Sequence, residues 1–342
     1  MNLGTWFGVG LLFVGGLLQG TFAVPMKYAR QWKHENIWFV FVLTGLVIFP
    51  WILTLVTVPS VAQVYSDTPM KALMLVVGFG IGWGVGATLT GVGLNMLGIS
   101  LGFAIIIGLS ASLGSLIPLL VLTPEKMATS RGHLYLVGTA IMLIAIGVVA
   151  VAGSIRERAE QASGGSGQTG GKRYLVGLVV AISAGILSSM LNFSYAFGSQ
   201  LLEAARHLGA STVWAANVVA APATSGGFLA NFLYCAYMMR RNKSTSRLWS
   251  PGTAGHWLLG LIMGAFWFGG LALYGVGVVR MGTFGTVVGW PLLMGTIILS
   301  SNAAGLVTGE WKMGGRRAKA YLFAGCGGIL IALLFLAMAQ QG

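Results

Sequence analysis

Long apolar stretches alternate with short polar or basic segments along the whole chain of 342 residues. A helix that crosses a bilayer needs about 20 mostly apolar residues, and ten stretches reach that length. They cover roughly residues 5–28, 37–58, 70–97, 100–122, 132–153, 173–197, 211–239, 254–279, 284–307 and 318–339. The pattern therefore predicts an all-α, polytopic membrane protein with ten transmembrane helices.

The third and eighth predicted helices contain related sequences. Gly80–Gly98 and Gly264–Gly282 agree at eight of 19 positions at a constant offset of 184 residues, and a tryptophan is among the shared positions. Glu125 and Glu310 stay in step at an offset of 185 residues. Self-similarity at a fixed spacing is typical of an internal duplication. We therefore expect two related halves of five helices each.

One segment differs in composition from the rest and divides the two halves. Residues 154–173 are first charged and then rich in Gly and Ser, which predicts a flexible linker between halves 1–153 and 174–342. Fifteen of the 20 Lys and Arg residues lie in loops that follow odd-numbered helices. Basic loops stay in the cytoplasm, so both termini are expected to be extracytoplasmic and the linker cytoplasmic. Because five is odd, the halves would form a 5+5 inverted repeat, which is typical of secondary transporters.

The amino-acid composition further limits the class of protein. Hydrophobic residues make up 56% of the chain, charged residues only 8%, and the mean hydropathy is +0.83, which leaves no room for a sizeable soluble domain. The net charge of +13 comes from the short loops, so we expect a lipid bilayer around the chain and no nucleic-acid partner. The sequence shows no metal-ligand cluster, paired carboxylates or hydrolase triad. We therefore expect no metal, no cofactor and no enzyme activity.

Neutral polar side chains inside apolar spans are the candidates for a binding site, because such groups are costly in a membrane unless they are paired. With the tryptophans that fall at mid-span, they are Gln19, Thr21, Trp83, Thr88, Thr90, Asn192, Asn217, Trp267, Tyr274 and Trp290. Amides and hydroxyls beside aromatic rings suit a sugar, which offers hydroxyl groups and an apolar C–H face. For any single residue, interhelical hydrogen bonding or ordinary core packing is the alternative. We expect the sugar in a midplane cavity between helices 1, 3, 4, 6, 8 and 9.

No Asp or Glu falls at mid-span, which argues against a cationic substrate and leaves a coupling proton without an obvious carrier. The candidates for proton coupling are therefore groups near helix ends, namely Glu35, Glu125, Glu203 and His256. Histidine titrates in the useful pH range, although His256 can equally anchor its helix at the interface. Lys27 is expected to be a positive-inside anchor, with an ion pair to Glu35 as a second possibility.

Several stretches taken together resemble the L-rhamnose–proton symporter family, which lies within the drug/metabolite transporter superfamily. The stretches are Pro25, Lys27, Trp32, Glu35 and Trp38; Trp83–Gly86; Leu97–Gly102; Gly185–Ile186 with Ser188; Glu203; Leu208–Gly209; Asn231; and Glu310–Trp311 followed by Gly315–Arg317. The resemblance implies a ten-helix carrier that uses the proton gradient to import a deoxy sugar across a bacterial inner membrane.

The residues leave some questions open within this resemblance. Ala87 and Thr90 stand where the family implies an Asn and a Tyr, and Asn192 stands where it implies a smaller hydroxyl residue. The particular sugar and the coupling ion, proton or sodium, therefore stay open. An exporter of drugs or metabolites with the same fold is the alternative function.

Overall fold

In the computed structural model, residues 3–97, 99–162, 172–282 and 285–339 are described, and this part of the chain contains helices and turns but no strand. The elements of the first half are α1 (Leu3–Thr21), η1 (Val24–Tyr28), α2 (His34–Leu43), the π-helical η2 (Thr44–Ile48), α3 (Phe49–Thr57), α4 (Val61–Asp67), α5 (Met70–Leu97), α6 (Ile99–Leu122), η3 (Pro124–Ala128) and α7 (Ser130–Ala162). Those of the second half are α8 (Lys172–Ser188), α9 (Met190–Phe197), α10 (Ser199–His207), α11 (Asn217–Arg241), η4 (Thr245–Trp249), α12 (Ala254–Arg280), α13 (Gly285–Val307) and α14 (Gly315–Ala339).

Ten helical spans among the described residues are long and apolar enough to cross a membrane, which confirms the predicted number. Two boundaries differ from the expectation. The fifth span, α7, continues to Ala162, so the first nine residues of the predicted linker are helical, and residues 163–171 lie outside the described residues. The seventh span begins only at Asn217, because the residues before it form turns.

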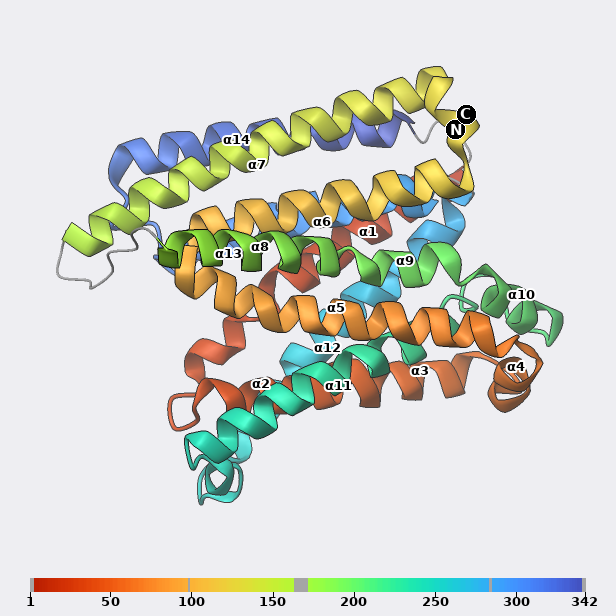
Figure 1. Ribbon diagram of the computed structural model, residues 1–342, viewed down its shortest axis with the longest axis horizontal. Coiled ribbons are helices and arrows are strands. Elements are labelled where there is room, and N and C mark those ends of the chain that lie inside the picture. Colours follow the sequence, from red (N-terminus) through yellow and green to blue (C-terminus); the bar gives the residue numbers. More distant parts are fainter. Residues whose placement is uncertain (1–2, 98, 163–171, 283–284, 340–342) are drawn as a thin grey trace.

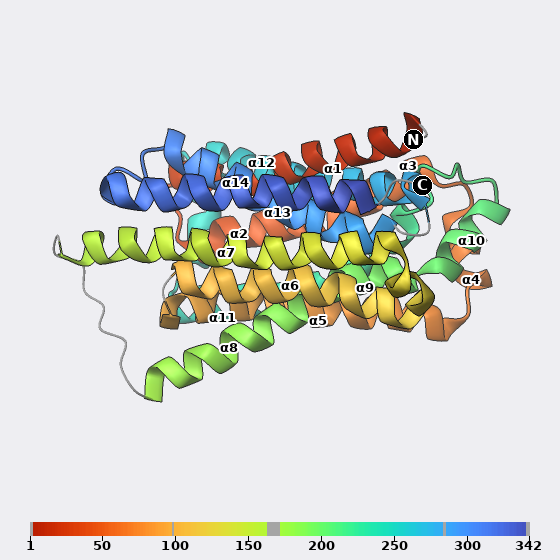
Figure 2. The ribbon, with the colours of Figure 1, turned by 90° about the horizontal axis from the view of Figure 1, so that it is seen from above.

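The spans lie roughly side by side and define two ends of the molecule (Figure 1). At one end α1 begins and α14 ends, and the short helices α4 and α10 lie beside them (Figures 1 and 2). We call this the terminal end. At the opposite end, which we call the linker end, α7 ends and α8 begins.

Close helix contacts depend on glycine. A Cβ on Gly15 of α1 would lie 2.8 Å from the carbonyl oxygen of Gly270 in α12, and one on Gly84 of α5 would lie 2.5 Å from that of Gly227 in α11. Small residues let helix backbones approach this closely in lipid, where apolar burial drives helices together only weakly. Through such contacts α1 packs along α12 and α13, while α8 packs along α5 and α6.

The helices α7 and α14 form the most extensive pair and lie along one side of the molecule (Figures 1 and 2). Gly325 of α14 fits directly against α7, because a Cβ there would lie 2.6 Å from Cγ2 and 2.9 Å from the backbone nitrogen of Val149. Gly138 of α7 faces α14 in the same way, with Leu336 and Phe335 near its missing Cβ. The pair therefore has little free volume between its backbones.

Two of the spans are interrupted. α1 ends at Thr21, and a turn leads into the 3-10 helix η1 within the same apolar span. The sixth span breaks at Ser189, between α8 and α9. Interrupted helices leave backbone polar groups without their regular partners, and transporters use such breaks at binding sites. The break in α1 lies beside the cavity described below.

Candidate substrate cavity

A cavity of about 340 Å³ lies in the half of the molecule nearer the linker end. Its walls come from the end of α1 and the break that follows it, the first half of α6, the second half of α7, the last turns of α13 and the connection from α13 to α14. Its polar lining residues are Gln19, Arg156, Ser301, Asn302 and Glu310, and most of the others are apolar. The volume suits a small ligand of monosaccharide size rather than a large one.

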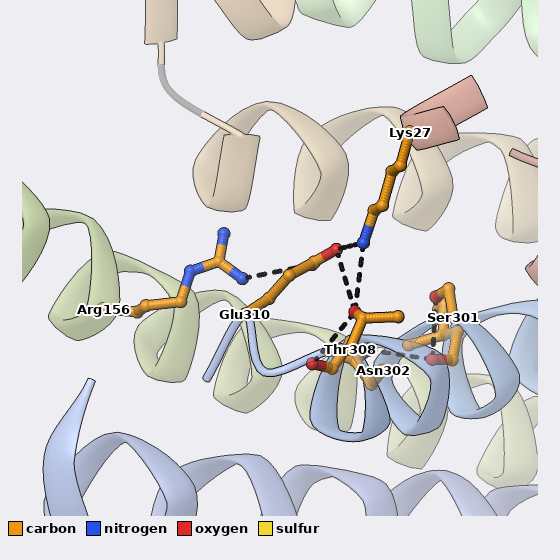
Figure 3. A network of polar contacts seen from close by, with 8 residues as sticks. Lys27, Arg156, Ser301, Asn302, Thr308 and Glu310 are labelled. Carbon is orange, nitrogen blue, oxygen red and sulfur yellow. Dashed lines mark hydrogen bonds and ion pairs between the residues drawn. The ribbon is translucent and has the colours of Figure 1, made fainter. Parts of the chain in front are cut away.

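An ionic network surrounds Glu310 at the edge of this cavity (Figure 3). Lys27 of η1 donates to Oε1 of Glu310 and also to Oγ1 of Thr308, at 3.0 Å. Arg156 of α7 places Nη1 3.9 Å from Oε2 of Glu310 and lies over the ring of Trp311, 5.0 Å from its centroid. Three separate elements therefore meet at one carboxylate.

The network corrects the second possibility considered for Lys27. Its partner is Glu310 rather than Glu35. Glu35 is buried at the start of α2 instead, and accepts hydrogen bonds from Ser244 Oγ at 2.6 Å and Asn242 Nδ2 at 3.0 Å. These two donors lie in the connection after α11, so Glu35 holds that connection to the start of α2.

Gln19 lies at the inner part of the cavity, one turn before the break in α1. Its Nε2 donates to the carbonyl oxygen of Trp267 at 3.2 Å, and no partner of Oε1 is found among the described residues. The rings of Trp267 and Trp83 stack with centroids 5.2 Å apart. Because the two rings contact each other, a sugar does not lie between them in this conformation.

A second cluster of polar side chains lies nearer the terminal end and is buried inside the protein. Asn192 of α9 donates from Nδ2 to the carbonyl oxygens of Gly114, at 2.7 Å, and Thr286, at 3.1 Å. Its Oδ1 accepts from the hydroxyl of Tyr274, and both side chains are fully buried. Trp290 packs edge-on against Tyr274 and donates to the carbonyl oxygen of Ser110. We call Asn192, Tyr274 and Trp290 the closed cluster.

The other predicted binding residues bond within or between helices and do not line this cavity. Thr21, Thr88 and Thr90 each donate to a carbonyl oxygen one turn earlier in the same helix. Asn217 donates to Oγ1 of Thr57 at 2.9 Å and so joins α11 to α3. Of the ten predicted binding residues, Gln19 is thus the one that lines this cavity.

The four coupling candidates are divided between the two ends. Glu125 on η3 and Glu203 on α10 are exposed at the terminal end. Glu35 and His256 lie at the linker end, where His256 Nε2 accepts from the backbone N–H of Gln31 at 3.4 Å. The His256 ring also packs on Trp32, with centroids 5.4 Å apart.

The cavity differs from the expected one in its walls. Helices 1, 4 and 9 line it as expected, but helix 5 replaces helices 3, 6 and 8. Sequence reasoning missed Arg156, Ser301 and Asn302. The two α13 residues carried a usable signal, since they are polar within the apolar span 284–307. Arg156 carried no such signal, because this residue falls in the segment predicted to be a flexible linker.

Ten apolar helices, four of which line a small cavity of mixed polarity, are the features of a multi-pass membrane protein that transports small molecules. The sequence pattern of the L-rhamnose-proton symport protein (RhaT) family matches residues 1–340, and the chain belongs to that family. Family membership and the ten apolar helices together imply a bacterial inner membrane.

Individual relatives agree with this assignment. The chain is 29% identical to the L-rhamnose-proton symporter of Salmonella typhi over 342 residues, covering 95% of each protein. It is 28% identical to the symporter of that name from Citrobacter koseri, covering 97% of each. A solved structure titled only as the crystal structure of a protein is 15% identical with a TM-score of 0.55, and covers 95% of this chain and 97% of its own. That last similarity concerns the fold alone.

Proposed function

We propose that this protein imports a deoxy sugar, L-rhamnose or a close relative, together with a proton. The observation that carries the proposal is the cavity of monosaccharide size with Gln19 at its inner part, in a chain whose relatives are named L-rhamnose-proton symporters. The neutral polar groups and apolar side chains of the cavity suit the hydroxyl groups and the C–H face of a sugar, while the charged Arg156 and Glu310 lie at its edge.

The proposed mechanism is alternating access between two halves related by a 5+5 inverted repeat. Such a repeat requires helix 6 to pack on helices 3 and 4 as helix 1 packs on helices 8 and 9. The contacts of α8 with α5 and α6, and of α1 with α12 and α13, agree with that requirement. Regular helix ends after 19 residues in α1 and after 17 residues in α8, which is a similar depth in spans one and six, as expected of inverted repeats.

In this mechanism the present conformation has its cavity on the cytoplasmic side. The cavity lies towards the linker end, which the distribution of basic residues assigns to the cytoplasm. The closed cluster seals the opposite half. In the outward-facing conformation the cluster separates, and Asn192 and Tyr274 then meet the sugar, with Thr90 and the rings of Trp83, Trp267 or Trp290 beside it.

Proton coupling requires a group whose protonation favours one of the two conformations. Glu35 is the proposed first choice, because it is buried and joins two connections at the linker end that a conformational change would separate. His256 at the start of α12 contacts Gln31 and Trp32 in the connection before α2, whereas Glu125 and Glu203 are exposed at the other end. Gln substitutions at the three acids and His256→Gln, made singly, distinguish among them.

The test is uptake of labelled L-rhamnose into proteoliposomes, with and without an inward proton gradient. We expect accumulation that collapses when a protonophore removes the gradient. Flux that ignores the proton gradient but follows a sodium gradient would assign sodium as the coupling ion. If folded protein in defined orientation carries no sugar and instead extrudes an amphipathic dye, the exporter alternative replaces the proposal. If Gln19→Ala, Asn192→Ala and Tyr274→Phe all transport normally, the proposed site is wrong.

A further inference from the structure

The cavity has two chemically different sides. Its neutral polar side chains come from α1 and α13, where Gln19, Ser301 and Asn302 lie. We call these three residues the polar wall. The lining residues from α6 and from α7 before Arg156 are apolar or glycine, and the six other than Gly153 are Phe103, Ala104, Ile107, Ile146, Val149 and Ala150. We call these six the apolar wall.

The polar wall offers acceptors that the protein itself does not use. Asn302 donates from Nδ2 to the carbonyl oxygen of Ile298 at 2.8 Å, and Ser301 donates to the same oxygen at 3.0 Å. Both bonds use only the donors of these side chains. No donor to Oδ1 of Asn302 or Oε1 of Gln19 occurs among the described residues, and both residues line the cavity. Such oxygens accept hydrogen bonds from the hydroxyl groups of a ligand.

We infer that the polar wall is the subsite that binds the hydroxyl groups of a deoxyhexose, and that the methyl group and C–H face of the sugar rest on the apolar wall. This inference rests on the proposed sugar transport and adds Ser301 and Asn302 of α13 as binding residues. It also distinguishes these binding residues from the closed cluster, where the side-chain amide nitrogen and oxygen of Asn192 both have protein partners. In the present conformation Asn192 is fully buried among these partners and does not face the cavity.

α13 provides a matched pair of adjacent serines. Ser301 is exposed and lines the cavity, and its described hydrogen bond stays within its own helix. Ser300 is 4% exposed, does not line the cavity and lies 2.9 Å from the carbonyl oxygen of Gly16 in α1. Ser301→Ala and Ser300→Ala thus remove the same hydroxyl from neighbouring positions, one facing the proposed ligand and one facing a helix.

The experiment measures equilibrium binding of L-rhamnose to purified protein, with thermal stability recorded for every variant. We expect Ser301→Ala and Asn302→Ala each to weaken binding by about 3- to 10-fold, as for the loss of one hydrogen bond. Ser300→Ala is expected to lower stability and leave the affinity within about 2-fold. If Asn302→Ala does not fold, Asn302→Leu and Ser301→Ala carry the test.

A second matched pair tests the apolar wall. Ile105 and Ile107 of α6 are both half-buried, but only Ile107 lines the cavity. Ile107→Thr should weaken L-rhamnose binding by about 3-fold or more, because it places a hydroxyl against the apolar face of the sugar. Ile105→Thr should leave the affinity unchanged.

The outcomes separate this inference from the proposed function. Normal L-rhamnose affinity in folded Ser301→Ala and Asn302→Ala overturns the polar wall while the sugar function stands. If the wild type does not bind L-rhamnose, the function assigned to it fails, and the same variants are tested with a panel of other deoxyhexoses and pentoses. Binding of one of these sugars with the same dependence on Ser301 and Asn302 upholds the subsite. Absence of binding across the panel overturns both.

Discussion

Two groups of polar residues in the apolar spans, one nearer the terminal end and one nearer the linker end, differ in how their hydrogen bonds are used. In the closed cluster, Asn192 bonds to α6, α12 and α13 at once. In the polar wall, the hydrogen bond of Asn302 among the described residues stays within its own helix, and the residue lines a cavity. Both are asparagines in apolar surroundings, yet the first joins helices and the second is available to a ligand.

The comparison shows how a polar residue in a membrane span can be interpreted. A group whose donors and acceptors are all used by other helices contributes to the stability of one conformation. A group whose acceptor is left unused beside a cavity contributes to binding. A transporter needs both, because the same amide that seals one side must release its partners when that side opens.

The largest expected effect is on the closed cluster. Asn192→Leu removes the acceptor of the Tyr274 hydroxyl and the donor to two backbone carbonyl groups in a buried site. We expect the free energy of unfolding to fall by about 2–3 kcal/mol. Asn302→Leu is the matched control and should change it by less than about 0.5 kcal/mol. Unfolding in mixed detergent micelles measures both, and equal losses would remove the distinction between the two groups.

A steric comparison comes next. A Cβ on Gly114 of α6 would lie 2.5 Å from Nε1 of Trp290, whereas one on Gly108 of the same helix would lie 3.5 Å from Leu143. We expect Gly114→Ala to cost about 1–3 kcal/mol, because it overpacks the closed cluster. Gly108→Ala should be neutral or stabilising by up to about 1 kcal/mol, since alanine favours the helix. Thermal unfolding followed by circular dichroism checks the difference in sign.

Transport should respond to Gln19 more than stability does. Gln19→Met keeps the length of the side chain but removes its amide, including the donor to Trp267 and the oxygen proposed to meet the sugar, so the apparent affinity for L-rhamnose should fall by about 10-fold. Thr21→Val is the control, because the Thr21 hydroxyl bonds within α1. Initial uptake rates over a range of sugar concentrations measure the effect. A similar loss in both variants would indicate damage to α1 rather than to the site.

The smallest effect is expected for the ion pair at the cavity edge. The side chains of Lys27 and Glu310 are 43% and 44% exposed, so their interaction is screened by solvent. A double-mutant cycle with Lys27→Met and Glu310→Gln should give a coupling energy of at most about 1 kcal/mol. That energy should decrease further in about 1 M salt. A coupling energy that is large and independent of salt would mean that the pair is buried in the membrane-embedded protein.

The sequence predicted the ten helices well because span length and apolar character are properties of each segment by itself. Gln19 and Asn192 were both recognised as buried amides, but their different surroundings could not be predicted. Those surroundings depend on how each helix is rotated against partners far away in the chain. The ion pair between Lys27 and Glu310, 283 residues apart, is another such contact.

Arg156 illustrates a different limit. Its neighbours in the sequence are charged and are followed by Gly and Ser, which is typical of a flexible linker. α7 nevertheless continues through this stretch and carries Arg156 to Trp311 and Glu310. Only the tertiary contacts of the helix end, which local composition does not contain, decide where the helix stops.

The tight pairing of α7 with α14 also bears on how the family could diversify. Val149 lines the cavity on one side and contacts Gly325 on the other, so a larger residue at this position would have to displace α14. Ser301 and Asn302 carry no such constraint, because the groups they present to the cavity bind no other helix. Relatives with different substrate preferences should therefore differ mainly in α13. The α7 side of the cavity should change more slowly, and only together with α14.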